Sequence, residues 1–305
     1  MITSVALSPS IDVTYPVPGL QVGAINRPTA VHRVAGGKGL NVARAAHRLG
    51  ADVAAPAMLG GATGEWIAEQ LGVLGLPVHA VDVASSTRMC VSIADGRHRM
   101  TEVYEPSAPV TVQEWSAATR MLSAVLSTRP GWVTVSGSIP DGHPTDGVGS
   151  LLRLVRGAGC RAAVDLHGQP LLDALAAGPD LVKVNVDEAS DALRASAGTT
   201  PADLAEQLAR RATVGAVVTA GVEGVHGSDR VGRAGHVRSD VSGSYPVGSG
   251  DAMLAALVTG LDRGEDILDA PVPACAVATA NALVPGAGCF DPADADRVRL
   301  GPVID

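Results

Sequence analysis

Short runs of consecutive hydrophobic residues alternate along the chain with longer stretches in which hydrophobic residues recur every three or four positions. The short runs predict strands buried on both faces, and the longer period predicts helices. The predicted strands are Ile2–Leu7, Val53–Leu59, Val78–Val83, Trp132–Val135, Arg161–Asp165, Leu181–Asn185 and Ala216–Thr219. The predicted helices are 39–49, 64–74, 111–127, 145–157, 186–195, 201–212, 251–263 and 272–284. This alternation predicts a three-layer α/β/α fold with a mostly parallel central sheet.

Two segments depart from this alternation. Residues 11–34 contain alternating hydrophobic patches with Pro and Gly, but no helical pattern. Residues 87–105 predict a hairpin, Arg88–Ala94 and His98–Tyr104, that turns at Asp95-Gly96. We expect these segments to form a small β-sheet, a lid inserted in a single domain that spans residues 1–305. After Pro285, the frequent Gly and Pro predict a surface loop.

Composition narrows the class of protein. The 305 residues are 46% hydrophobic but only 2% aromatic, so the core is expected to consist of Ala, Val and Leu. The net charge of −8, without a basic block, argues against nucleic acid as a partner. No hydrophobic run reaches the ~18 residues of a membrane span, and no signal peptide is apparent. The four cysteines are scattered, which predicts a reduced, cytoplasmic protein without a zinc site.

The segment Gly248-Ser249-Gly250-Asp251 opens a hydrophobic helix. Glycines allow backbone N–H groups to converge on one point, and a helix N-terminus adds positive potential there, so a phosphoryl group would be well placed. A carboxylate beside such a site repels the phosphate, unless it removes a proton from the attacking hydroxyl. The alternative is that Asp251 only caps its helix.

A second glycine-rich segment, Gly36-Gly37-Lys38-Gly39-Leu40-Asn41, leads into the helix 39–49. It lacks the earlier Gly and the following Ser or Thr of a Walker loop, and it lacks the G-x-G-x-x-G spacing of a dinucleotide site. The absence of that fingerprint also argues against a nicotinamide oxidoreductase.

Seven motifs in the same order resemble the ribokinase/pfkB superfamily of sugar kinases, and the resemblance covers nearly the whole chain. They are Asp12, the segment 36–41, Thr87-Arg88, Ser136–Pro140, Lys183–Glu188, Gly221–Gly224 and Gly248–Asp251. The segments Asn26-Arg27, 36–39, 136–140 and Lys-x-Asn are most similar to the branch of 1-phosphofructokinases and tagatose-6-phosphate kinases. The resemblance therefore implies an ATP- and Mg²⁺-dependent kinase of a phosphorylated ketohexose.

The resemblance also implies roles for individual residues. Asp251 would be the catalytic base, and the amides of Ser249, Gly250 and Asp251, after Gly248, would hold the charge of the transferred phosphoryl group. The sugar hydroxyls would contact Asp12, Gly36, Gly37 and Asn41. The substrate phosphate would contact Arg88, Arg27, Lys38 and Ser138, with Arg27 on the lid of a homodimer and serving the neighbouring subunit.

On the nucleotide side, Asn185 and Glu188 match an N-x-x-E pair that orders Mg²⁺ through its waters. The nucleotide would contact Lys183, Asn185, Thr219, Gly221, Glu223 and Gly224, with Asn281 near the base. Each residue also has an ordinary structural interpretation: Asp12 as a turn residue, Glu188 as a first-turn acid, and Arg27 as a surface charge.

The chain departs from the family pattern at Ser249, at Tyr245-Pro246 and at Tyr104 and Ser107. Because Tyr104 and Ser107 would border the sugar, a kinase of an unphosphorylated sugar or nucleoside remains an alternative. A non-catalytic sugar-phosphate-binding protein is the alternative from another class, although it would not need Asp251, Asn185 and Glu188.

Overall fold

A large central sheet carries most of the chain's strands. The computed structural model describes residues 1–76, 78–96, 99–128 and 130–301. The strands of this sheet are β1 (Ile2–Val5), β4 (Val53–Leu59), β5 (Val78–Asp82), β8 (Trp132–Ser136), β9 (Arg161–Asp165), β10 (Leu181–Asn185), β11 (Gly215–Thr219), β12 (Val225–Asp229) and β13 (Ala234–Val237). Their order is β13-β12-β11-β10-β9-β8-β1-β4-β5, and all neighbours are parallel except β11–β12 and β12–β13.

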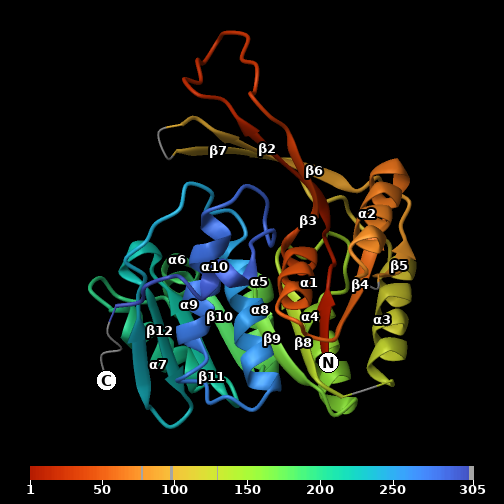
Figure 1. Ribbon diagram of the computed structural model, residues 1–305. Helices are drawn as coiled ribbons and strands as arrows, with labels where there is room; N and C mark the ends of the chain where they lie inside the picture. The colour runs from red at the N-terminus through yellow and green to blue at the C-terminus, as the bar shows by residue number, and fades with distance from the viewer. Residues whose placement is uncertain (77, 97–98, 129, 302–305) are drawn as a thin grey trace.

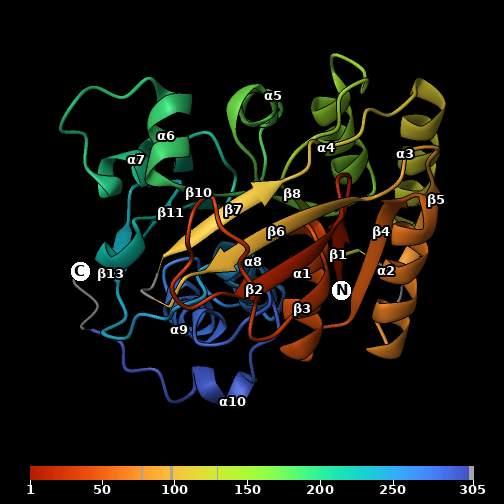
Figure 2. The ribbon, with the colours of Figure 1, turned by 90° about the horizontal axis from the view of Figure 1, so that it is seen from above.

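Helices cover both faces of this sheet, as the two views show (Figures 1 and 2). One face carries α1 (Lys38–Arg48), α2 (Gly61–Val73), α8 (Ser249–Asp262) and α9 (Pro271–Ala282). The other carries α3 (Val112–Leu126), α4 (Gly147–Gly157), α5 (Gly168–Ala177), α6 (Val186–Leu193) and α7 (Pro201–Ala209). The predicted three-layer α/β/α fold with a mostly parallel sheet is confirmed.

A separate four-stranded sheet rises above the body of the protein (Figure 1). Its order is β3 (His32–Gly36), β2 (Ser10–Pro16), β6 (Arg88–Ala94) and β7 (Met100–Tyr104). The predicted hairpin is present as β6 and β7. His98, where the second strand was predicted to begin, lies outside the described residues. Because side chains alternate along a strand, Asp12, Cys90 and Tyr104 share one face, while Val13, Val91 and Val103 share the other.

Local sequence signals explain where several helices begin. Helix α3 starts with a reciprocal capping box between Thr111 and Glu114, and α6 starts with the same arrangement between Asn185 and Glu188. Helix α8 begins after Gly248, whose φ of 79° is a backbone conformation that favours glycine. None of the described helices is long and apolar enough to cross a membrane.

The structure also contains elements that the periodicity does not predict. Helix α5 begins at Gly168 and is followed by Gly178 as its C-cap, and a glycine in a sequence pattern usually indicates a turn. Strands β12 and β13 contain Gly, His and Ser, which weaken a strand pattern. The segment after Pro285, predicted to be a surface loop, is instead packed: Phe290 is completely buried, and α10 (Pro292–Ala295) follows it.

Candidate active site

A polar cavity of about 540 Å³ lies between the small sheet and the carboxyl ends of the central strands. Clefts of this size hold small-molecule ligands in many proteins, and open α/β sheets bind ligands at this edge. Most of the residues selected from the sequence line it: Asp12, Gly37, Lys38, Asn41, Arg88, Ser138, Lys183, Asn185, Glu188, Thr219, Gly248, Gly250 and Asp251. Segments 210 residues apart along the chain therefore meet in one cavity.

Asn41 connects two carboxylates in this cavity. Its side-chain Nδ2 donates to Asp251 Oδ2 at 2.9 Å and lies 3.4 Å from Asp12 Oδ2. Asp12 also accepts from Ser10 Oγ at 2.5 Å and from the Gly37 amide at 3.3 Å. A Cβ at Gly36 would lie 2.1 Å from Asp12 Oδ2, so the carboxylate occupies space that only glycine leaves open. Asp12 is thus held on several sides.

Both carboxylates are buried, and burial raises the pKa of each. For Asp251, the desolvation is partly opposed by Lys38, and the pKa is raised to about 6. A carboxylate with this pKa is largely ionised at pH 7 but takes up a proton more readily than an ordinary Asp. These are the properties of a general base near neutral pH.

Asp165 lies between two lysines. Lys183 Nζ donates to Asp165 Oδ2 at 2.6 Å, and Lys38 Nζ donates to Oδ1 at 2.8 Å. Burial alone would raise the pKa of Asp165, but the two ammonium groups lower it to about 2. Burial alone would lower the pKa of Lys38, but nearby carboxylates, Asp165 first, raise it above its ordinary value. Both members of the Lys38–Asp165 pair therefore stay charged at neutral pH.

The first turn of α8 points backbone amides toward the cavity. The Ser249 amide already donates to the Pro246 carbonyl at 3.1 Å, whereas those of Gly250 and Asp251 have no acceptor among the described residues. The N-cap is Gly248, without a side-chain cap, so the carboxylate of Asp251 does not cap this helix. An anion at this turn would meet two amides and the helix dipole.

Asn185 and Glu188 form the capping box of α6 at the end of β10. Asn185 Oδ1 accepts from the Glu188 amide at 2.8 Å, and Glu188 Oε2 accepts from the Asn185 amide at 2.9 Å. The second oxygen, Glu188 Oε1, lies 4.0 Å from Lys38 Nζ. Among the described residues, no group of three or more His, Cys, Asp or Glu could hold a metal ion. Asn185 and Glu188 alone therefore suit a cation that keeps most of its own waters, as Mg²⁺ does.

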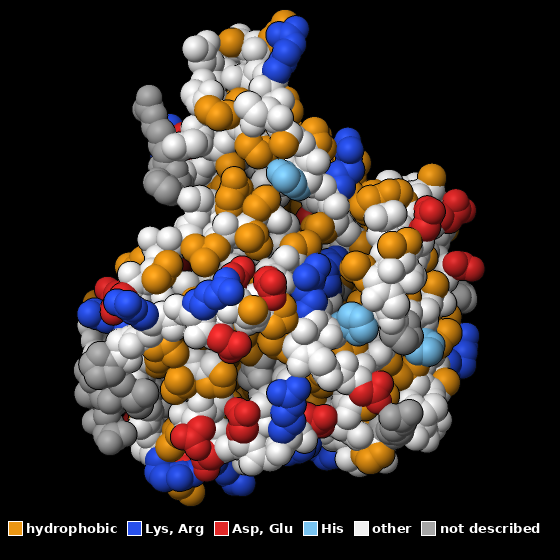
Figure 3. Space-filling view, in the orientation of Figure 1, with side chains coloured by type: hydrophobic (Ala, Val, Ile, Leu, Met, Phe, Trp, Pro, Cys, Tyr) orange, Lys and Arg blue, Asp and Glu red, His pale blue; other side chains and the backbone are white. Residues whose placement is uncertain are grey.

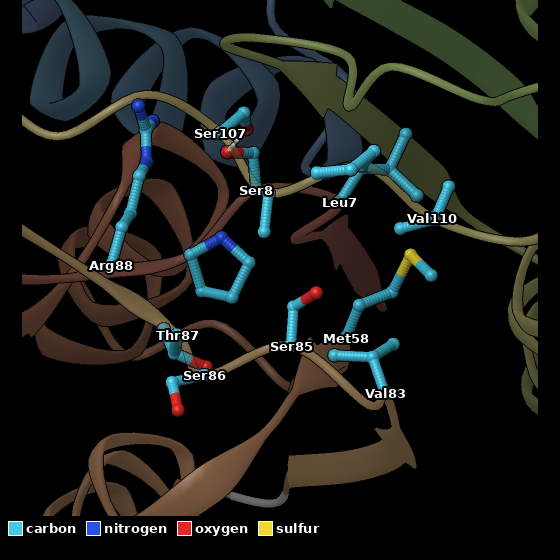
Figure 4. A pocket seen from close by; sticks show the side chains of 13 residues that line it. Leu7, Ser8, Met58, Val83, Ser85, Ser86, Thr87, Arg88, Ser107 and Val110 are labelled. Carbon is cyan, nitrogen blue, oxygen red and sulfur yellow. Dashed lines mark hydrogen bonds between the residues drawn. The ribbon is translucent and has the colours of Figure 1, made fainter.

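Arg88 lines both the polar cavity and a smaller chamber of about 30 Å³, whose side chains are drawn in Figure 4. Its Nη1 donates to the Glu105 carbonyl at 3.0 Å, while its buried Nε has no hydrogen-bond partner among the described residues. Hydroxyls gather in the chamber, and Ser8 and Ser107 are hydrogen-bonded to each other. A buried unpaired N–H is costly, so this position favours a ligand that accepts from it.

A second, apolar cavity of about 500 Å³ adjoins the first at Thr219, Pro246 and Gly250. Helices α8 and α9 supply Met253, Cys275 and Ala278 to its wall, and the loop after β11 supplies Gly221 and Gly224. Ser249 lines it too. An apolar cavity beside a set of helix N-terminal amides is suited to a ligand with a flat apolar part and a phosphate tail.

Four selected residues lie outside both cavities. Gly36 lies behind Asp12, and Arg27 is exposed on the loop between β2 and β3. Glu223 is exposed, and its carbonyl contacts His236 Nε2 at 2.8 Å. Asn281, expected near a nucleotide base, is instead completely buried. Its amide donates to the Val247 carbonyl at 3.0 Å and to Ser249 Oγ at 3.2 Å, so it supports the Gly248 turn from behind.

Three charged residues lie at or beside the site without having been predicted from the sequence: Asp165 and Glu102, which line the polar cavity, and Arg44, which contacts Asn41. Asp165 ends β9, and a carboxylate at the carboxyl end of a parallel strand is a signal that could have identified it. Arg44 gave no such signal, because a lone Arg within a helix is usually a surface residue.

The family model described as pfkB family carbohydrate kinase matches residues 1–294. The chain therefore belongs to the pfkB family of carbohydrate kinases, and it is an ATP-dependent sugar kinase.

Individual relatives agree with this assignment. The chain is 29% identical over 266 residues to a tagatose-6-phosphate kinase from Staphylococcus epidermidis, covering 86% of this chain and 85% of the relative. The structure of phosphofructokinase-2 from Escherichia coli with substrates and products matches with a TM-score of 0.87 and 27% identity, over 98% of this chain and 97% of that one. A possible 1-phosphofructokinase from Thermotoga maritima matches with a TM-score of 0.86 and 25% identity over the full length of both chains.

Proposed function

We propose that this kinase transfers the γ-phosphoryl group of ATP to a hydroxyl of a phosphorylated ketohexose and so makes a bisphosphate. Fructose 1-phosphate, giving fructose 1,6-bisphosphate, is the first candidate, and tagatose 6-phosphate is the second. The observation that carries the proposal is the position of Asp251: it lines the polar cavity beside the free amides of α8 and directly follows Gly250, where the polar and apolar cavities adjoin. The names of the relatives support the substrate class.

In this mechanism the sugar occupies the polar cavity, with hydroxyls on Asp12 and the Asn41 amide, beside Gly37. The acceptor oxygen attacks the γ-phosphorus in line, its proton passes to the carboxylate of Asp251, and ADP leaves with the electrons of the broken P–O bond. The free amides of Gly250 and Asp251 stabilise the charge on the transferred oxygens. Lys183, which lines the same cavity and is paired with Asp165, would contact the same phosphates.

ATP would lie with its base in the apolar cavity, along Thr219, Gly221 and Gly224. Mg²⁺, which neutralises phosphate charge, would be held through its waters by Glu188 and Asn185. The capping box leaves Glu188 Oε1 free of its helix, and this agrees with an indirect contact. Since ATP and sugar phosphates are intracellular metabolites, we place the enzyme in the cytoplasm.

The substrate phosphate is proposed to bind Arg88 and Ser138, with Lys38 nearby. The buried Nε of Arg88 lacks an acceptor, and a phosphate oxygen would supply one. Lys38 is already paired with Asp165, so it contributes charge rather than a free ammonium.

The small sheet, with residues 11–34 and 87–105, is proposed to act as the lid of a single kinase domain and as the contact of a homodimer. Hydrophobic side chains gather on the projecting part of the molecule (Figure 3). The exposed fraction is 99% for Val22, 83% for Ile25 and 61% for Val103. Burying such side chains stabilises association, and it would bring Arg27 of one subunit toward the other.

An ADP-release assay tests the proposal. The purified protein is screened with ATP and Mg²⁺ against hexoses, pentoses, nucleosides and their monophosphates. We expect the highest kcat/KM with a ketohexose monophosphate. A preference for an unphosphorylated sugar or nucleoside would contradict the substrate class, and binding of sugar phosphates without turnover would contradict the assignment as a kinase.

A further inference from the structure

Arg44 is a charged residue in the interior of the protein. It lies on α1, three residues after Asn41, and only 2% of its surface is exposed. Burial lowers the pKa of its guanidinium, but an Arg side chain stays protonated in proteins. A buried charge is costly unless several hydrogen bonds satisfy it, so the contacts of Arg44 show what it holds in place.

One of these contacts determines the orientation of Asn41. Arg44 Nη1 lies 3.2 Å from Asn41 Oδ1, and a guanidinium can only donate hydrogen bonds. The amide oxygen of Asn41 must therefore face Arg44, and its NH₂ group must face Asp251 and Asp12. If the amide turned over, an oxygen would face two carboxylates and an NH₂ would face a cation.

The other contacts join two further parts of the site. Arg44 Nη1 donates to the Ala287 carbonyl at 2.6 Å, and Nη2 donates to the carbonyl of Ala35, the last residue but one of β3. Ala287 lies directly behind the Gly248 turn, since a Cβ on Gly248 would lie 2.2 Å from its Cβ. Asn281 Oδ1 accepts from the neighbouring Gly288 amide at 2.7 Å, so residues 287–288 are held from two sides.

We propose that Arg44 is a positioning residue of this kinase: it fixes the Asn41 amide between Asp12 and Asp251 and anchors the 287–288 turn behind Gly248, without touching the substrate. The proposal rests on the proposed function, because it assigns catalytic value to the geometry of Asp251. Arg44 does not line either cavity. Lys could keep the charge, but it could not reproduce the planar fork that reaches Asn41, Ala287 and Ala35 together.

The test compares Arg44→Lys and Arg44→Gln with Arg48→Gln as a matched control. Arg48 lies one turn further along α1, and its Nη1 donates to the Phe290 carbonyl at 3.1 Å, so it ties the same helix to the same C-terminal segment but does not contact Asn41. We expect both Arg44 variants to lose kcat by on the order of 10²-fold, as misplacement of a reacting group does, while the KM for ATP stays close to wild type. Arg48→Gln should keep the wild-type kcat.

Two further readouts separate positioning from general support of the fold. Arg44→Gln removes a positive charge near Asp251, so the acid limb of its kcat–pH profile should move to higher pH, whereas Arg44→Lys should keep the wild-type limb. In an Asn41→Ala background, Arg44→Lys should cost less kcat than it does in the wild type, because the Arg44–Asn41 contact is already gone and only the contacts with Ala287 and Ala35 remain to be lost. Circular dichroism and Tm report whether each variant folds. If Arg44→Gln does not fold, the kcat of Arg44→Lys alone tests the proposal.

Wild-type kcat in Arg44→Lys, an equal loss in Arg48→Gln, or fully additive losses with Asn41→Ala would overturn the role of Arg44 and leave the proposed function intact. A wild-type protein that phosphorylates no acceptor in the ADP-release screen would overturn the proposed function itself, and the role of Arg44 with it. The two failures are therefore distinguishable.

Discussion

Asn41 and Asp251 are 210 residues apart in the sequence, yet Asn41 Nδ2 donates to Asp251 Oδ2 at 2.9 Å. The same amide group approaches Asp12, so the side chain of Asn41 bridges Asp251, in the last third of the chain, and Asp12, in the small sheet. This places the base assigned to Asp251 directly beside the residues assigned to the sugar.

The base assignment is tested by Asp251→Asn. The amide preserves the shape of the side chain but cannot accept the proton of the acceptor hydroxyl. We expect kcat to fall by about 10²–10⁴-fold, while ATP binding measured by calorimetry changes little. Activity close to wild type would end this assignment.

The raised pKa of Asp251 has a consequence for stability. An acid whose pKa is higher in the folded than in the unfolded state loses stability as pH rises from about 4 to about 6. A folded pKa of about 6 in place of 3.8 corresponds to about 3 kcal/mol at pH 7. Asp251→Asn should therefore unfold at higher urea concentration than wild type at pH 7, and this advantage should vanish near pH 4. Equal stability at pH 7 would contradict the buried, ionised carboxylate.

Asp165→Asn should change stability in the opposite direction and destabilise the protein at pH 7. Its folded pKa of about 2 means that its contribution is present above pH 4 and is lost as pH falls toward 2. Removing the carboxylate leaves Lys38 and Lys183 without their partner, so we expect a loss of about 3–5 kcal/mol at pH 7. Asp146→Asn, which breaks the surface pair with Arg153, is the control and should leave the urea midpoint unchanged. A small effect would contradict a buried Asp165 carboxylate held by two lysines.

Arg88→Ala tests whether Arg88 binds the phosphate group of the substrate. A charge-assisted hydrogen bond contributes about 1.5–3 kcal/mol, so the KM for the phosphosugar should rise by about 10- to 100-fold. The KM for ATP should stay near the wild-type value, since Arg88 does not line the apolar cavity. Steady-state kinetics with both substrates varied would reveal equal effects, which would argue against this role.

Glu188→Gln tests the metal contact separately from the fold. Glutamine can also complete a capping box, so Tm should change little, while the lost charge should raise the Mg²⁺ concentration needed for half-maximal rate. Glu114→Gln makes the same exchange in the capping box of α3, away from both cavities, and should not alter the Mg²⁺ requirement. Identical Mg²⁺ titrations of the two variants would contradict a metal role for Glu188.

Periodicity predicted the parallel sheet, its helices and the hairpin, because each rests on local patterns of side chains. It did not predict α5, whose Gly168 and Gly178 read as turns, or the burial of Phe290, which depends on how the C-terminal segment returns to α1. The meeting of the 36–41 and 248–251 segments followed from the resemblance rather than from either motif alone.

The charged contacts of the site are the part that sequence could not supply. The pair Lys38–Asp165 joins residues 127 apart, and Arg44 reaches Ala287 across 243 residues. No spacing rule connects residues so distant along the chain, since their partners are determined by packing. For the same reason, Asn281 could be selected as a site residue, but its position behind the turn could not be foreseen.

The alternation of side chains along β2 and β6 limits which changes of length this enzyme can tolerate. Asp12 and Cys90 face the cavity, while their neighbours Val13 and Val91 face away, with each like pair in register. Deleting or inserting one residue in either strand would exchange these two sets of side chains. Changes in pairs would preserve both surfaces, so natural length variation is expected at the loop 17–31 rather than within the strands.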